Sequence, residues 1–315
     1  MSHQRTASDP AAPHHNSGCF APVGVLVCRR MSAPSDLAVQ RMTRDVTARG
    51  VRMRVLEAGA DQPTPLVLLH GFLASHLEFD DVIDSLARRF HVIVPDLPGF
   101  GESEKPSPSK YAYSVESFAE AVADLIAAYG VGRACVLGHA LGGSIALTLA
   151  THHAELVTRL GLVAPLCYPT TLGWRARLPL LPVIGGVLFK QLWGRRVFRS
   201  YFQREVFGAD AFVPTERIDR LYDNFNSPSA RESAYAVLKA MRDTRSVVAR
   251  IPRVTRPTLV LWGRDDRVVP ASYALKLARE IPDTRLELFD TGHSPHEERP
   301  SEFVFTVTEF FEGKR

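Results

Sequence analysis

A short apolar strand, a tight turn and a helix form the stretch whose spacing points most directly to chemistry. It runs from Cys135 to Ser144 and places Gly138 and Gly142 on either side of Ala140. In a G-x-S-x-G turn of this kind, the central serine sits on a strained bend and projects its hydroxyl above the sheet as a nucleophile. Glycines flank the apex because a Cβ there would strike the neighbouring strand or helix. Here the apex is alanine, so the stretch has the build of a nucleophile elbow but lacks the nucleophile.

This stretch resembles Gly-His-Ser-Leu-Gly-Gly of the α/β-hydrolase fold superfamily, and the resemblance continues in register over roughly residues 43 to 313. The segment His70-Gly71-Phe72 matches the loop that donates one backbone N–H to an oxyanion hole, and residues 95–103 match an Asp-x-x-Gly-x-Gly-x-Ser loop. The resemblance implies a doubly wound, mostly parallel sheet and a capped, esterase-, lipase- or C–C hydrolase-like protein.

The same resemblance implies roles for four other residues. The triad acid is the fourth residue counted from the glycine of strand-Gly-x-x-Asp, which is Asp266, and the triad histidine is His293. The oxyanion donors are the backbone N–H groups of Phe72 and Leu141, the second of which is favoured further by its place at a helix N-terminus. Asp265 is the alternative acid, more typical of a solvated loop.

Two further residues, each within or beside one of these motifs, are expected to have no catalytic role. Asp96 lies in the loop of residues 95–103, where an aspartate holds the turn through backbone hydrogen bonds. His296 follows His293 closely and is interpreted as its neighbour at the surface.

Strands and helices alternate along most of the chain, as a doubly wound α/β sheet requires. Residues 51–57 alternate apolar and polar side chains, which suggests an edge strand, and residues 65–70 are a continuous apolar run typical of a buried parallel strand. Ser114 is expected to cap a helix that ends at Gly130. The alternation stops between 165 and 250. We therefore predict a disordered tail over 1–40, a core of 41–164 and 251–315, and a helical cap of 165–250 inserted after the sixth strand.

Composition sets the broad class. The 315 residues are 45% hydrophobic and 23% charged, enough for a large core, and a net charge of +4 does not argue for nucleic acid. Four cysteines without C-x-x-C spacing favour a reducing, cytoplasmic setting. The apolar run from Phe20 to Cys28 is too short to span a bilayer and lacks signal-peptide flanks, and Met31 is an alternative start. We expect no metal, since adjacent histidines such as His14 and His15 in a tail rarely form a closed site, and no cofactor.

The first part of the predicted cap is basic and apolar. It carries seven basic residues and no acidic residue between Thr170 and Arg204, namely Arg175, Arg177, Lys190, Arg195, Arg196, Arg199 and Arg204. Such a segment can rest on an anionic membrane surface. The interpretation that we prefer is a cap whose Leu and Phe side chains line an acyl-sized pocket while its arginines face water.

The missing serine leaves several accounts open. His293, oriented by Asp266, can activate a water lodged where the hydroxyl would lie, which gives hydrolysis or C–C cleavage without a covalent intermediate. The chain can instead be a non-catalytic descendant that binds a small ligand or a protein, or carry an engineered serine-to-alanine change. Relocation of the nucleophile to Ser144 or Cys167 is the least favoured. We predict a hydrolase of an ester or related acyl substrate of moderate apolarity that uses water.

Overall fold

The structure is a computed structural model that describes residues 39–169, 185–209, 211 and 214–313. The predicted tail of residues 1–40 lies outside the described residues except for 39 and 40. Among the described residues, no helix is both long and apolar enough to cross a membrane.

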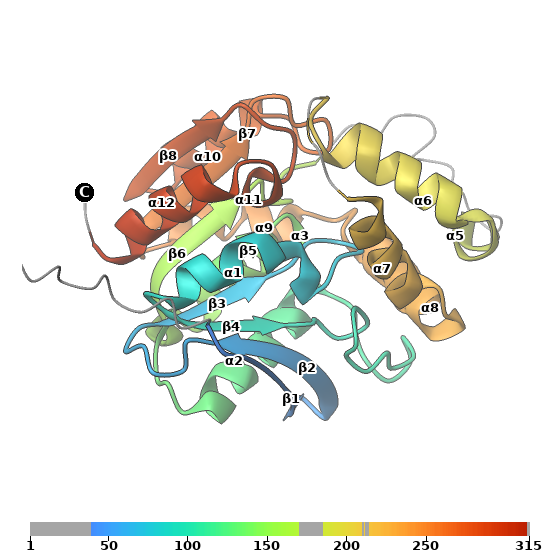
Figure 1. The fold of residues 1–315 in the computed structure, drawn as a ribbon, viewed down its shortest axis with the longest axis horizontal. Coiled ribbons are helices and arrows are strands. Elements are labelled where there is room, and N and C mark those ends of the chain that lie inside the picture. The colour runs from blue at the N-terminus through green and yellow to red at the C-terminus, as the bar shows by residue number, and fades with distance from the viewer. Residues whose placement is uncertain (1–38, 170–184, 210, 212–213, 314–315) are drawn as a thin grey trace, which may run out of the picture. The chain divides into compact units, whose positions relative to one another are not determined.

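Eight strands form one mixed sheet, in the order β1-β2-β4-β3-β5-β6-β7-β8 (Figure 1). Their bounds are β1 Arg41–Ala48, β2 Val51–Ala58, β3 Pro65–Leu69, β4 His91–Pro95, β5 Ala134–His139, β6 Val157–Val163, β7 Thr258–Gly263 and β8 Thr284–Phe289. β1 and β2 are antiparallel to each other, and β2 is antiparallel to β4, while every other pair is parallel. The predicted α/β, doubly wound and mostly parallel sheet is confirmed.

One strand prediction was wrong. Residues 51–57 were expected at an edge, but β2 pairs with β1 on one side and with β4 on the other. The alternation along β2 reflects burial of one face, with Met53 and Val55 buried and Arg52 exposed. Such a pattern reports which face meets water and carries no information on which edge is unpaired.

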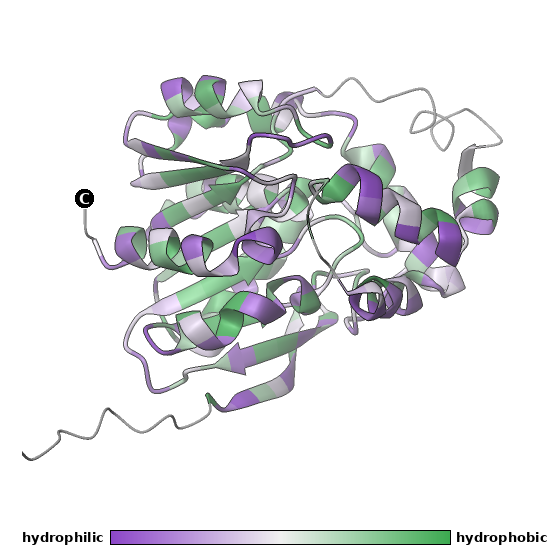
Figure 2. Ribbon diagram, turned by 45° about the horizontal axis from the view of Figure 1, so that its top comes forward, coloured by the Kyte–Doolittle hydropathy of each residue, from purple (hydrophilic) through white to green (hydrophobic). Residues whose placement is uncertain are grey.

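Helices cover both faces of the sheet (Figure 2). The side chains of the strands divide between these two faces. In β3, Val67 and Leu69 join the cluster that contains α2, α3 and α10, while Leu66 and Leu68 join the cluster that contains α1 and α12. The period-two alternation of a strand produces this division. The helices and short helical turns of the core are η1 His76–Phe79, α1 Asp80–Ala87, α2 Val115–Tyr129, α3 Leu141–His152, η2 Ala154–Leu156, α10 Ser272–Glu280, α11 Pro295–Glu298 and α12 Pro300–Phe311.

The ends of α2 agree with their predicted signals. The Ser114 hydroxyl accepts a hydrogen bond from the Ser117 N–H, and Gly130 ends the helix with a left-handed φ of 66°. Both features satisfy backbone groups that a helix terminus leaves without intrahelical partners.

A helical insertion follows β6, as predicted, and Figure 1 shows its helices α5 to α8 grouped beside the sheet. Its described elements are α5 Gly185–Leu192, α6 Arg195–Tyr201, the π-helical turn η4 Phe202–Val206, α7 Thr215–Phe225, α8 Pro228–Ala240, α9 Arg245–Val248 and η5 Ile251–Arg253. Phe198 is fully buried among other rings, with its centroid 5.6 Å from that of Phe225 and 4.9 Å from that of Phe202. The aromatic side chains of the insertion therefore pack on one another, within the same hydrophobic cluster as one face of the sheet. The division at residues 165 and 250 stays a prediction.

Candidate active site

The elbow between β5 and α3 has the strained geometry that its glycines suggest. Ala140 has φ 49° and ψ −108°, a conformation that non-glycine residues avoid, and it is 4% exposed. A Cβ on Gly138 would lie 2.1 Å from the Gly142 carbonyl oxygen, and one on Gly142 would lie 2.1 Å from the Leu69 carbonyl oxygen. The bend therefore depends on glycine at both positions, whatever residue occupies the apex.

His293 and Asp266, predicted as a pair from the sequence, are hydrogen-bonded. The distance from His293 Nδ1 to Asp266 Oδ2 is 2.7 Å, and the other carboxylate oxygen accepts the N–H groups of Val268 and Val269, each at 2.8 Å. A carboxylate accepts, so Nδ1 carries the proton and Nε2 carries the lone pair. No described residue hydrogen-bonds Nε2. Asp265 is exposed, as expected for a solvated loop residue.

The elbow, the histidine loop and the loop after β3 meet at Ala140. The rings of His139 and His293 have centroids 4.6 Å apart, and His139 Nε2–H donates to the His293 carbonyl at 3.0 Å. A Cβ on Gly71 would lie 3.4 Å from the Ala140 Cβ, so the loop that carries Phe72 borders the apex directly. The N–H groups of Phe72 and Leu141, the predicted oxyanion donors, bond no described residue.

Backbone strain gathers around this point. Four non-glycine residues of the described chain have positive φ, and three of them border the elbow: Leu73 at 63°, Ala140 at 49° and Ala164 at 41°. Leu73 follows Phe72, and Ala164 comes directly after β6. Such residues cost of order 1–3 kcal/mol each and cluster at functional sites.

Asp96 holds its loop, as expected. One of its oxygens accepts the N–H and Nδ1–H of His76 at 2.7 and 2.9 Å, and the other accepts the Glu102 N–H at 2.7 Å. Burial by itself would raise the pKa of Asp96, but the hydrogen bond and charge of His76 outweigh it and lower the pKa. The side chain is fully enclosed and committed to these partners.

Neither substitute nucleophile is placed to act. The Ser144 hydroxyl donates to the Leu166 carbonyl at 2.8 Å and is buried in the helix packing. Cys167 is fully buried, and this burial raises the pKa of its thiol, so the reactive thiolate is disfavoured.

The interpretation of His296 as a surface residue was wrong. It is fully buried, with its ring between those of Phe79 and Phe303 and 4.8 Å from that of His139. The run His-Glu-Glu-Arg has the polar composition of a surface turn, but α11 turns it inward beneath the elbow. Its depth follows from tertiary packing, which local composition does not encode.

Sequence reasoning also missed Glu78 and His139. Both are buried and hydrogen-bonded to each other at 2.8 Å between Glu78 Oε1 and His139 Nδ1. A signal was present, because every residue of β5 is buried and a histidine at its end must find a partner. That partner lies 61 residues away along the chain.

The insertion attaches directly to the histidine loop. His293 N–H donates to the Val206 carbonyl at 2.7 Å, and Glu298 accepts from the N–H groups of Gly208 and Gly292 at 3.1 and 3.0 Å. A Cβ on Gly292 would lie 2.4 Å from Gly208 N, so glycine is required for this approach.

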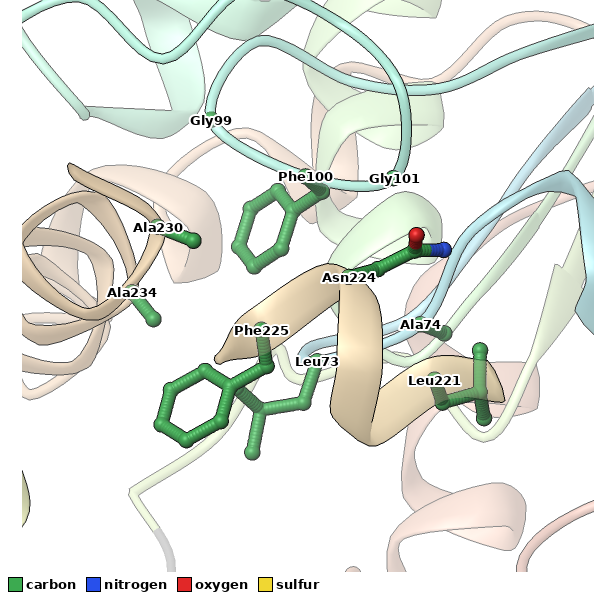
Figure 3. A pocket seen from close by; sticks show the side chains of 10 residues that line it. All are labelled: Leu73, Ala74, Gly99, Phe100, Gly101, Leu221, Asn224, Phe225, Ala230 and Ala234. Carbon is green, nitrogen blue, oxygen red and sulfur yellow. The ribbon is translucent and has the colours of Figure 1, made fainter. Parts of the chain in front are cut away.

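A small cavity lies between the insertion and the core loops (Figure 3). Its volume is about 10 Å³, and Leu73, Phe100, Leu221, Asn224 and Phe225 are among its lining residues. A cavity of this size holds about one water. An acyl substrate that used this space would therefore have to separate α7 and α8 from the loops beneath them.

The basic cap segment is partly neutralised. Arg195 pairs with Asp223 at 2.5 Å, and Arg199 forms a bidentate pair with Asp219. Arg175 and Arg177 lie outside the described residues. The apolar side chains divide between two environments: Phe189 and Phe198 are buried, while Val187, Leu192 and Val197 are exposed.

The family model for the alpha/beta hydrolase fold matches residues 64–300, and the chain belongs to this family. It is 30% identical to the magnesium-chelatase 30 kDa subunit of Rhodobacter capsulatus, over 82% of this chain and 90% of that protein. It is 29% identical to 2-hydroxymuconate semialdehyde hydrolase of a Pseudomonas species, over 89% of this chain and 96% of that protein. A thermophilic esterase structure from Thermogutta terrifontis shares the fold, with a TM-score of 0.73, 23% identity and coverage of 86% and 98%. The activities named for these proteins differ, so similarity alone does not identify the reaction of this chain.

Proposed function

We propose that the chain is a hydrolase of esters or related acyl compounds in which His293 and Asp266 activate water instead of a serine. The observation that carries this proposal is the oriented pair at 2.7 Å beside an apex that retains its strain although it holds only a methyl group. The strain of the apex, about 1–2 kcal/mol, is imposed by the tight packing at the flanking glycines. The support for a function therefore comes from the oriented His293–Asp266 pair.

The proposed reaction has two steps. His293 Nε2 takes a proton from water, and the resulting hydroxide attacks the substrate carbonyl. The negative oxygen then accepts hydrogen bonds from the N–H groups of Phe72 and Leu141. As the tetrahedral intermediate collapses, the imidazolium returns its proton to the departing alkoxide, while Asp266 stabilises the charged ring throughout.

Carbon–carbon cleavage is a second candidate for the same site. It is favoured by the likeness to 2-hydroxymuconate semialdehyde hydrolase over nearly the full length of both chains. His293 would take a proton from the attacking water, and as the bond between the carbonyl carbon and its neighbour breaks, it would give this proton to the carbon that leaves. The same residues are used, but the proton goes to carbon and not to an alkoxide oxygen.

The test measures turnover of p-nitrophenyl esters of short to medium chain length, and of 2-hydroxymuconate semialdehyde, by the unmodified chain and by variants. We expect slow turnover by the unmodified chain, above the roughly 10³–10⁴-fold acceleration over water that the oxyanion hole and binding supply without a triad. His293→Ala should lower turnover to that residual level, and Asp266→Asn should strongly reduce it. The matched control, Asp265→Asn, should leave it unchanged, and a serine-directed fluorophosphonate should have no effect.

The variant Ala140→Ser distinguishes the proposed hydrolase from a non-catalytic protein that only binds a ligand. Activity that appears only in Ala140→Ser would show a silenced site and would favour a role in binding. Inhibition of the unmodified chain by the fluorophosphonate would contradict water as the nucleophile.

A further inference from the structure

Beneath the proposed site, the Glu78 carboxylate joins two of its loops. Glu78 Oε2 accepts the Gly71 N–H at 2.8 Å, and Gly71 precedes the proposed donor Phe72. Glu78 Oε1 lies 2.8 Å from Nδ1 of His139, the residue before Ala140. Glu78 and His139 are 6% and 2% exposed, so water does not compete for these bonds.

The third loop is joined through the other ring nitrogen of His139. Its Nε2 lies 3.0 Å from the His293 carbonyl oxygen, which can only accept. Nε2 therefore carries a hydrogen. Because Nδ1 faces a carboxylate oxygen, a second proton must lie between His139 and Glu78 to make a hydrogen bond there.

From this geometry we infer that Glu78 and His139 are positioning residues for the proposed hydrolysis, and that they form a buried carboxylate–imidazolium pair which fixes the oxyanion loop, the elbow and the histidine loop relative to one another. The inference rests on the proposed function, since it assigns how that site is held in register. Neither side chain contributes a reacting atom. They act through Phe72, Leu141 and His293.

The surroundings of the pair agree with this protonation. Burial by itself would raise the pKa of Glu78, but the charge and hydrogen bond of His139 lower it to about 2. Burial would lower the pKa of His139, but the charge and hydrogen bond of Glu78 raise it. The other titratable groups that face the pair are His70, His293, His296 and Glu297.

A bound metal is the competing explanation. The ligand atoms of Glu78, His139 and His296 lie within 4.8 Å of one another. A cation would have to replace the proton between Glu78 and His139 and break their hydrogen bond. The 2.8 Å separation already suits a hydrogen bond, so we assign a proton to this position.

Three variants of the full chain test the inference. Glu78→Gln can keep every hydrogen bond, because its amide oxygen can accept from Gly71 while its NH₂ donates to a neutral His139. Glu78→Ala cannot. We expect Glu78→Ala to lower kcat by about 10²-fold with little change in KM, and Glu78→Gln to stay near the unmodified chain, because small misplacement of reacting groups costs about this much. Glu57→Ala is the matched control, since it removes another Glu–His pair, in which the buried Glu57 lies 2.7 Å from the partly buried His91.

Nuclear magnetic resonance supplies a readout that does not depend on turnover. In the unmodified chain at pH 8, both ring nitrogens of His139 should resonate as N–H groups, whereas in Glu78→Gln only Nε2 should. The amide resonances of Phe72 and Leu141 should shift in Glu78→Ala and not in Glu57→Ala. The NMR measurement tests the inference even if the chain turns over no substrate. An absence of turnover would count against the proposed function and not against the inference.

Several results would overturn the inference. They are a neutral His139 at pH 8, a Glu78→Gln variant as impaired as Glu78→Ala, unmoved amides in Glu78→Ala, or a stoichiometric metal found by elemental analysis of the purified chain.

Discussion

At the scale of single residues, His296 shows the sharpest conflict between chemistry and surroundings. Its ring is fully buried, and neither of its nitrogens has a hydrogen-bond partner among the described residues. Burial, with a smaller effect of His139, lowers the pKa of His296 to about 3. The folded chain therefore keeps this ring neutral at a pH where an unfolded chain, with a pKa near 6.5, takes up a proton.

This difference predicts an acid-sensitive stability. Because the folded pKa is depressed, the unfolded chain binds more protons between about pH 6.5 and 3, and the free energy of unfolding falls as pH falls through that window. One proton contributes at most about 1.4 kcal/mol per pH unit. The variant His296→Phe keeps a ring between Phe79 and Phe303. We expect its free energy of unfolding to fall less on acidification than that of the unmodified chain.

Urea unfolding at pH 7.5 and pH 5 measures this effect. The comparison between variant and unmodified chain cancels the contributions of other groups, such as Glu297, whose pKa burial raises to about 8 and whose pH dependence has the opposite sign. Equal losses in both chains would contradict the prediction.

At the scale of elements, one arginine ties the insertion to the core. Arg217 of α7 forms a bidentate pair with Asp81 of α1, at 2.6 and 2.7 Å, and lies 3.3 Å from Glu297 of α11. The side chain of Arg217 is only 16% exposed, while that of Asp81 is 38% exposed, so these bonds are only partly shielded from water and salt. Arg217 therefore connects the cap to α1 and, through Glu297, to α11, which follows the histidine loop.

Removal of this arginine should loosen the attachment. We expect Arg217→Gln to lower the free energy of unfolding by about 1–2 kcal/mol, because the bidentate, charge-assisted hydrogen bonds to the partly exposed Asp81 are lost. Arg220→Gln, on the same helix, should change it by less than about 0.5 kcal/mol, since that side chain is 62% exposed and lies 4.0 Å from Asp80. Chemical denaturation compares the two, and equal effects would show that burial of the pair is unimportant.

At the scale of the whole molecule, the charge distribution bears on membrane contact. The net charge is only +4, and two of the basic residues of the cap segment, Arg195 and Arg199, are paired with acidic residues of α7. The exposed Val187, Leu192 and Val197 remain as apolar contacts. We favour the interpretation in which the segment shapes the cap.

This preference predicts no cosedimentation with vesicles that contain anionic phospholipid at about 150 mM salt, where surface charges are screened beyond about 8 Å. Vesicles of neutral lipid serve as the control. Binding to the anionic vesicles that weakens with added salt and is lost in Leu192→Glu would establish a membrane contact instead.

The sheet was predictable because its signals are local. Apolar runs, alternation and the glycines about Ala140 each act on neighbours in the chain, and they placed the strands, the elbow and the insertion. The resemblance supplied His293 and Asp266, and the structure brings these two together, although their catalytic part stays a prediction. What the sequence left open depends on tertiary contacts: the pairing of Glu78 with His139, the depth of His296, and which side chains of the cap point inward.

The glycines of the elbow have a consequence for how this chain can change. They impose the bend, so the turn forms with alanine at residue 140 as well as with serine. Alanine codons become serine codons through a single nucleotide change. Under the proposed function, the chain stands one mutational step from a site with a serine nucleophile, and a population carrying this gene would sample that step continually. Whether selection retains alanine at this position is a question that laboratory evolution on ester substrates can answer.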